Sequence, residues 1–135
     1  MVTFENSYLS MWFDPEVKLL YSEWKRLPTQ QEYQDGVKRS EKLLNSYQVL
    51  YWIMDSTRLA AMPIEQQSTT LHYMAQVIVT SSIKKLARIV PKDNSIISFF
   101  EDTLQLAQKA YNSKIEIDRF NTYKAAADWI GMIGC

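Results

Sequence analysis

The sequence predicts a single α/β domain, residues 1–135, with a mixed and mostly parallel sheet. Short apolar runs alternate along the chain with longer segments in which apolar residues recur at helical spacing. The segments between the later runs hold about 10 to 20 residues, enough for the helix that a parallel crossover requires. A chain of 135 residues with 47% hydrophobic content forms one domain with a sizeable core. The predicted order of elements is β-β-α-β-α-β-α-β-α.

Two aromatic-rich runs near the amino terminus predict an antiparallel hairpin. They are SYLSMWF (7–13) and VKLLYSEW (17–24), separated by the turn residues DPE. Alternation in the first run places Tyr8 and Trp12 on one side of the hairpin. The opposite side carries Leu9, Met11 and Phe13. Because both sides are apolar, we expect both to be covered by helices, a ligand or another subunit.

A helix and a buried strand follow the hairpin. Thr29 and Glu32 form a capping box, and helical spacing continues through Tyr33, Val37, Leu44 and Tyr47. The next run, VLYWIM (49–54), does not alternate between apolar and polar residues. This pattern is typical of a parallel strand that is buried on both faces.

The second helix is predicted to begin at Pro63, because proline favours the first turn of a helix. Its inner stripe holds Leu71, Met74 and Ile78. The strand LARIV (86–90) follows and stops at Pro91.

Asp93 or Asn94 is expected to cap the third helix. One face of that helix carries Ile97, Phe100, Leu104, Ala107 and Tyr111. The last strand is KIEIDRF (114–120), and Asn121 or Thr122 caps a terminal helix. The apolar positions of the terminal helix are Ala126, Trp129, Ile130 and Ile133.

Composition argues against several classes of function. Fifteen basic and fifteen acidic residues cancel, so no net charge attracts nucleic acid or an anionic membrane. The start MVTFENSYLS lacks the features of a signal peptide, and no apolar run approaches the ~18 residues of a membrane span. We therefore expect a cytoplasmic protein. His72 and Cys135 are the sole histidine and cysteine, so we expect no metal site and no cofactor.

Four segments resemble the small bacterial STAS-like family. They are FDPEVKLLYSEWKRLPTQQEYQDGVKRSEKLL, the tryptophan strand that ends in Asp at YWIMDSTRL, MPIEQQ, and IKKLARIVPKD. The family is related in fold to anti-sigma factor antagonist domains and more distantly to CRAL-TRIO lipid-binding domains. The resemblance covers residues 8–131 and implies a superhelix of β/α turns and a regulatory or ligand-binding role without known catalytic chemistry. Met62 departs from the pattern, because related sequences often carry a capping Ser there.

The polar residues after the buried strand have two interpretations. STAS antagonists carry a phosphorylatable Ser or Thr in a strand-to-helix loop, so the resemblance implies that Ser56 or Thr57 is a regulatory site. The alternative is that Asp55, Ser56 and Thr57 end the strand because their side chains satisfy backbone donors in the turn.

A second candidate site follows from the predicted topology. The carboxyl ends of neighbouring parallel strands meet at one edge of the sheet, where open α/β sheets place ligands. Asp55 and Arg58 follow one strand, and Lys92, Asp93 and Asn94 follow the next. Arg58 and Lys92 favour an anion there.

The sequence contains no assembled catalytic constellation, so we predict a protein that is not an enzyme. The first hypothesis is a non-catalytic regulatory or protein-interaction module that forms a homodimer. Its interface would use the hairpin aromatics Tyr8, Trp12, Tyr21 and Trp24. The alternative is a carrier or sensor of a small apolar or lipid-like ligand, as the CRAL-TRIO relationship implies.

Overall fold

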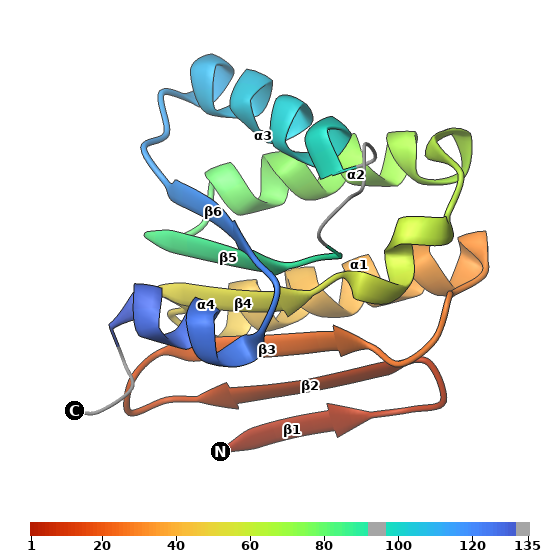
Figure 1. The fold of residues 1–135 in the computed structure, drawn as a ribbon. Coiled ribbons are helices and arrows are strands. Elements are labelled where there is room, and N and C mark those ends of the chain that lie inside the picture. The colour runs from red at the N-terminus through yellow and green to blue at the C-terminus, as the bar shows by residue number, and fades with distance from the viewer. Residues whose placement is uncertain (92–96, 132–135) are drawn as a thin grey trace.

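The computed structural model describes residues 1–91 and 97–131 and confirms the predicted fold class. Within these residues, a six-stranded mixed sheet is covered by four helices (Figure 1). The strands are β1 (Val2–Glu5), β2 (Leu9–Asp14), β3 (Leu19–Trp24), β4 (Tyr51–Asp55), β5 (Lys85–Ile89) and β6 (Glu116–Phe120). The helices are α1 (Gln30–Ser46), α2 (Ile64–Val79), α3 (Ile97–Tyr111) and α4 (Tyr123–Ile130), with a 3₁₀ helix η1 (Thr57–Ala61) before α2.

The strands lie in the sheet in the order in which they occur in the sequence. β1, β2 and β3 pair antiparallel, whereas β3, β4, β5 and β6 pair parallel. The prediction omitted β1, which is a four-residue edge strand whose Val2 and Phe4 pack against the core. The predicted hairpin is correct and becomes the inner part of a three-stranded antiparallel unit.

The two faces of the sheet are covered unequally. Helices α1, α2 and α3 lie on one face, and α4 lies on the other (Figure 1). The larger core contains Trp52 and Met54 from β4, and the smaller core contains Ile53 with Ala126 of α4. Because β4 is buried on both of its faces, its run of apolar residues needs no alternation, as predicted.

The amino terminus of α1 has the predicted capping box. Thr29 Oγ1 accepts from the Glu32 backbone N–H at 3.1 Å, and a Glu32 carboxylate oxygen accepts from the Thr29 N–H at 2.9 Å. Arg26 adds two 2.8 Å hydrogen bonds to the same carboxylate. The first turn of α1 is therefore satisfied by both backbone and side-chain partners.

The other helix boundaries follow the sequence with some corrections. Pro63 is the N-cap of α2, and η1 was not predicted. Thr122 caps α4, with Oγ1 accepting from the Ala125 N–H at 3.2 Å. Tyr111 does not lie on the buried face of α3, because its side chain is 49% exposed. The predicted caps Asp93 and Asn94 and the apolar position Ile133 lie outside the described residues.

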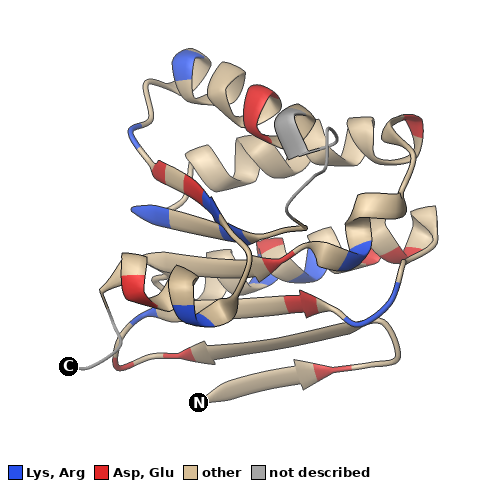
Figure 2. Cartoon of the chain, in the orientation of Figure 1, with Lys and Arg blue, Asp and Glu red and all other residues tan. Residues whose placement is uncertain are grey.

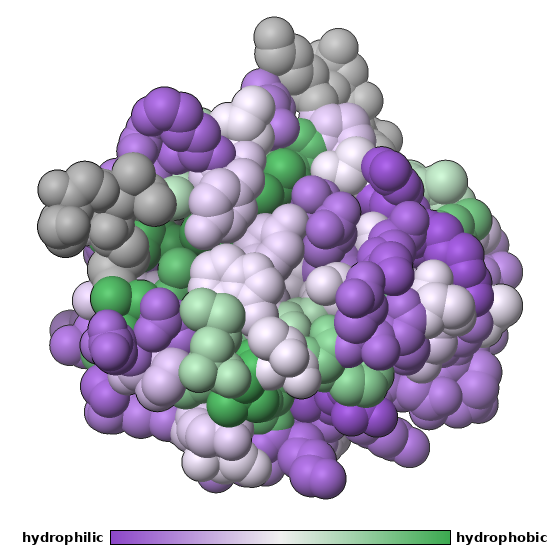
Figure 3. Space-filling view, turned by 90° about the horizontal axis from the view of Figure 1, so that it is seen from below, coloured by the Kyte–Doolittle hydropathy of each residue, from purple (hydrophilic) through white to green (hydrophobic). Residues whose placement is uncertain are grey.

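The surface carries charges of both signs. Basic and acidic residues are interspersed over the strands and helices (Figure 2). Seen from the side of β1, pale and apolar surface occupies the middle of the molecule and hydrophilic surface lies toward its borders (Figure 3). No helix in residues 1–91 and 97–131 is long and apolar enough to cross a membrane.

Candidate functional site

A small cavity lies between the sheet and the helices α1, α2 and α3. Its volume is about 40 Å³, and its lining comes from β2, β3, β4, β5, η1 and these three helices. The polar lining residues include Tyr33, Ser56, Gln67 and Arg88, whereas Met54 and others supply apolar atoms. The cavity is thus a mixed polar and apolar site within the larger core.

The sheet register places Arg88 in this cavity. Ser22 of β3, Met54 of β4, Arg88 of β5 and Arg119 of β6 are register partners across the parallel strands. Side chains in register on parallel strands point to the same face of the sheet. This row lies near the carboxyl ends of β4 and β5, the region where parallel sheets place ligands.

Arg88 is buried, and two of its nitrogens have no hydrogen-bond partner. The residue is 6% exposed, and its Nε and Nη1 atoms find no acceptor among the described residues. Its Cζ atom lies 3.9 Å from the centre of the Phe100 ring, which gives a cation–π contact. The ring stabilises the charge but accepts none of the hydrogen bonds that the guanidinium can donate in its plane.

Glu101 is the acidic side chain whose charge acts on Arg88, but it forms its ion pair with another arginine. The Oε1 atom of Glu101 forms an ion pair with Nε of Arg119 at 3.3 Å. No ion pair in residues 1–91 and 97–131 involves Arg88. Burial lowers the pKa of Arg88 from its usual value to about 10, and the charge of Glu101 opposes this shift. Arg88 is therefore a buried cation at neutral pH whose positive charge is not balanced by an ion pair among the described residues.

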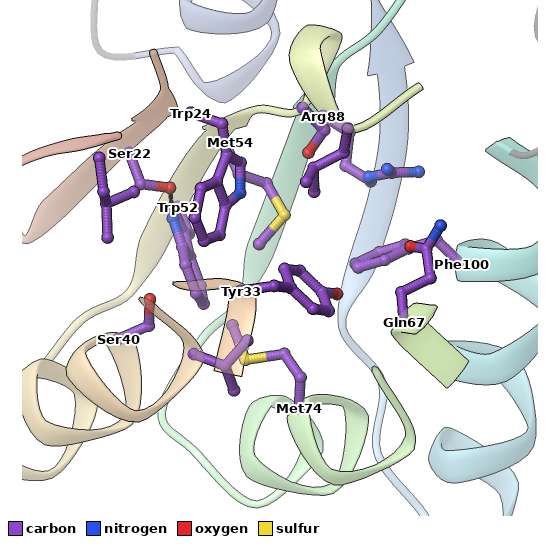
Figure 4. Close-up of a pocket in the computed structure, with 14 residues that line it drawn as sticks. Ser22, Trp24, Tyr33, Ser40, Trp52, Met54, Gln67, Met74, Arg88 and Phe100 are labelled. Carbon is purple, nitrogen blue, oxygen red and sulfur yellow. Dashed lines mark hydrogen bonds between the residues drawn. The ribbon is translucent and has the colours of Figure 1, made fainter. Parts of the chain in front are cut away.

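Tyr33 contributes a second donor to the same region. Burial raises the pKa of Tyr33 to about 12, and the charge of Arg88 opposes the shift. The Tyr33 hydroxyl is therefore protonated at neutral pH and can donate a hydrogen bond. In Figure 4 the side chains of Arg88, Tyr33 and Gln67 converge around Phe100. The Gln67 amide nitrogen is already used, because it donates to the Met62 carbonyl at 3.0 Å.

The predicted loop site after β4 is a strand end. The Asp55 Oδ1 atom accepts from the Thr57 N–H at 3.0 Å, as the turn interpretation predicts. Ser56 is buried at 4% exposure, so phosphorylation of its hydroxyl would require a conformation other than the one described. Thr57 is half-buried, and a regulatory role for it stays a prediction.

The predicted anion edge is only partly described. Arg58 is exposed in η1 and does not line the cavity that Arg88 lines. Lys92, Asp93 and Asn94 lie outside the described residues. The cation that lines the cavity between the sheet and α1, α2 and α3 is Arg88, which the sequence-based prediction did not select. An arginine between Ala87 and Ile89, inside a strand expected to be buried, was the available signal.

The four hairpin aromatics do not share one face, which corrects the predicted interface. Trp12 and Tyr21 are register partners, stack at 5.5 Å and lie on the α4 side of the sheet. Trp24 lies on the opposite side, because it is three residues beyond Tyr21 and side chains alternate along a strand. Tyr8 stacks on Trp24 at 6.2 Å and so belongs to the helix-covered side.

Comparisons with protein-family models, curated proteins and solved structures find no match to this chain. The described residues contain no group of three or more His, Cys, Asp or Glu side chains that could hold a metal ion. The arrangement around Arg88 can supply positive charge and hydrogen-bond donors to a small enclosed ligand.

Proposed function

We propose that this chain is a non-catalytic binding module that holds a small anion against Arg88. The observation that carries the proposal is the pair of buried guanidinium nitrogens, Nε and Nη1, without an acceptor among the described residues. Leaving such donors unsatisfied costs about 1–3 kcal/mol each, and more when the group is charged. An anion in the adjoining cavity would supply both the missing acceptors and the missing negative charge.

The size of the cavity favours a small ligand over the lipid-like ligand expected from the CRAL-TRIO relationship. Pockets for drug-sized molecules have volumes of about 300–1,000 Å³. The cavity beside Arg88 has about 40 Å³, so a lipid chain would have to displace parts of the core. We therefore keep the sensor or carrier role in the proposal, with a small anion in place of the apolar or lipid-like ligand. The STAS-like resemblance is compatible with such a regulatory role and remains part of the proposal.

Titration with small anions, followed by amide chemical shifts, tests the proposal. Sodium formate, acetate, nitrate and sulfate are added separately at pH 7 and constant ionic strength. We expect at least one anion to give saturable shifts at residues around the cavity, including Met54 and Arg88. The same shifts should be lost in Arg88→Met. If no anion gives saturable shifts in the wild-type protein, the proposal is wrong.

Self-association is a second candidate function, supported by the aromatic pair on the less covered face. Trp12 and Tyr21 are half-buried, because α4 packs mainly against β4, β5 and β6 and reaches this pair through an edge contact between Tyr123 and Tyr21. Aromatic residues are enriched in interfaces, and a specific homodimer would bury at least ~1,000 Å² in total. Sedimentation at micromolar concentration tests this. A persistent monomer refutes the dimer, and a dimer that Trp12→Ala leaves intact refutes this choice of surface.

A further inference from the structure

We infer that the ligand of the Arg88 cavity is a short monocarboxylate, of acetate or propionate size, with its carboxylate against Arg88 and its alkyl group toward Met54 and Met74. This inference rests on the proposed function and adds the charge, size and chemical class of the ligand. Three features of the site support it: the local balance of charges, the volume of the cavity, and the division of its lining into polar and apolar parts.

The charges around the cavity call for one negative charge. Arg88 and Arg119 are register partners on neighbouring strands, and both interact with Glu101 of α3. Among these three side chains, two cations and one anion leave a net charge of about one positive unit. A monoanion would balance this charge, whereas a dianion such as sulfate would leave a buried negative charge uncompensated.

The volume of the cavity limits the ligand to a few atoms. One water-sized site requires roughly 10–15 Å³ on this kind of measure. A cavity of about 40 Å³ therefore corresponds to about three such sites, close to the size of acetate or propionate. A carboxylate offers two oxygens, so a single group can accept from more than one donor of the guanidinium and the Tyr33 hydroxyl.

The lining distinguishes a carboxylate from an anion that is polar on all sides. Arg88 and Tyr33 supply donors, whereas Leu59, Met54 and Met74 supply apolar atoms. An alkyl group has no hydrogen-bonding atoms, so it can be buried against these apolar side chains without leaving a polar atom unsatisfied. Nitrate has the same charge and a similar size, but with two oxygens on Arg88 and Tyr33 its third oxygen would lie against Leu59, Met54 and Met74, none of which can donate a hydrogen bond.

The small size of the ligand also limits its affinity. Even the most efficient small ligands have an upper limit of binding free energy per non-hydrogen atom. For acetate, which has four such atoms, this limit means a dissociation constant no lower than about 40 µM. The titration should therefore run from about 20 µM to 50 mM. Acetate, propionate, nitrate, sulfate and octanoate, all as sodium salts, are compared at pH 7 and fixed ionic strength by amide chemical shifts.

We expect acetate or propionate to bind at least tenfold more tightly than nitrate, sulfate or octanoate. Tighter binding of nitrate or sulfate would overturn the carboxylate assignment while leaving an anion site in place. Tighter binding of octanoate would overturn the size. Absence of saturable binding by all five would overturn both this inference and the proposed function.

Charge variants test the local balance directly. Glu101→Gln raises the net charge beside the cavity by one unit, so sulfate affinity should increase at least tenfold relative to acetate affinity. Arg88→Met should weaken acetate at least tenfold. Lys109→Met, which removes an exposed cation near the other end of α3, is the matched control and should change acetate affinity less than threefold. An unchanged sulfate-to-acetate ratio in Glu101→Gln would overturn the charge argument.

Discussion

The indole Nε1 of Trp52 donates to Ser22 Oγ at 2.9 Å, joining two buried side chains on neighbouring strands. Trp52 lies on β4 and Ser22 on β3, and both line the Arg88 cavity. The hydrogen bond satisfies the single donor of the indole, which would otherwise be buried without a partner. It also holds the ring in one orientation in the lining of the cavity (Figure 4).

The first prediction concerns this pair. Trp52→Ala should lower the free energy of unfolding by about 3–5 kcal/mol, because it opens a large cavity in the core. Ser22→Ala should cost about 1–3 kcal/mol, because it leaves the indole N–H unsatisfied. Urea unfolding of both single variants and the double variant measures these effects. A loss below ~1 kcal/mol in Trp52→Ala would contradict the central position of β4.

The second prediction concerns the contact between α1 and β3. Gly36 of α1 lies against the indole of Trp24, and a Cβ atom at Gly36 would overlap this ring. Gly36→Ala gains about 1 kcal/mol of helix propensity, but overpacking costs about 1–3 kcal/mol. We therefore expect a net loss of stability in urea unfolding.

Two variants separate overpacking from other effects of the Gly36 substitution. Asn45→Ala changes an exposed position of the same helix and should not reduce stability. In a Trp24→Leu background, Gly36→Ala should become stabilising because the ring is absent. If the substitution costs the same in both backgrounds, the contact with Trp24 is not its cause.

The sequence predicted the elements whose signals are local. The capping box of Thr29 and Glu32 and the unbroken apolar run around Trp52 each identify an element without information from elsewhere in the chain. The division of Trp12 from Trp24 between the two faces was also available from strand alternation, once the bounds of β2 and β3 were known. β1 was missed because four residues with modest apolar content give little periodic signal.

The Arg88 cavity could not be predicted in the same way. The environment of the Arg88 guanidinium depends on Tyr33 from α1, Phe100 from α3 and the ion pair between Glu101 and Arg119. These residues are far apart in the sequence and meet only after the crossovers have formed. An arginine within an apolar strand indicates an unusual position, but neither its burial nor its lack of an acceptor is a local property.

The third prediction concerns stability in acid. Hydrogen bonds from Arg26, followed by the Thr29 backbone N–H, lower the pKa of Glu32 from 4.5 to about 2. Because the folded-state pKa lies below the unfolded value, the charged carboxylate stabilises the fold above pH 4.5, and this contribution is lost as the pH falls toward 2. Glu32→Gln should therefore be less stable than the wild type at pH 7 and similar to it near pH 2.

Urea unfolding between pH 2 and 7 checks this dependence. Glutamine can still form a capping box, so the comparison isolates the charge rather than the cap. Glu65→Gln, in the first turn of α2, provides a control at an exposed carboxylate. A stability difference for Glu32→Gln that is independent of pH would show that the carboxylate charge does not contribute.

The last prediction separates a binding role for Arg88 from a structural one. Replacing a buried charged group by an apolar side chain of similar volume is often neutral or stabilises by about 1–4 kcal/mol. In buffer free of small carboxylates, we therefore expect Arg88→Met to equal or exceed the wild type in its free energy of unfolding at pH 7. Burial lowers the pKa of Arg88 from its usual value to about 10, so the folded state releases its proton before the unfolded state does. Above pH 10 the buried charge of Arg88 should therefore destabilise the fold less as the pH rises further.

Addition of acetate should reverse the order of the two proteins. A ligand that binds only the folded wild type raises its stability with concentration, whereas Arg88→Met lacks the site and should not respond. Phe100→Leu tests the remaining structural explanation, because it removes the aromatic ring beneath the guanidinium while keeping an apolar side chain. If Arg88→Met lowers stability by more than ~2 kcal/mol without ligand, the contact with Phe100 already compensates the charge, and the case for an anion in the cavity fails.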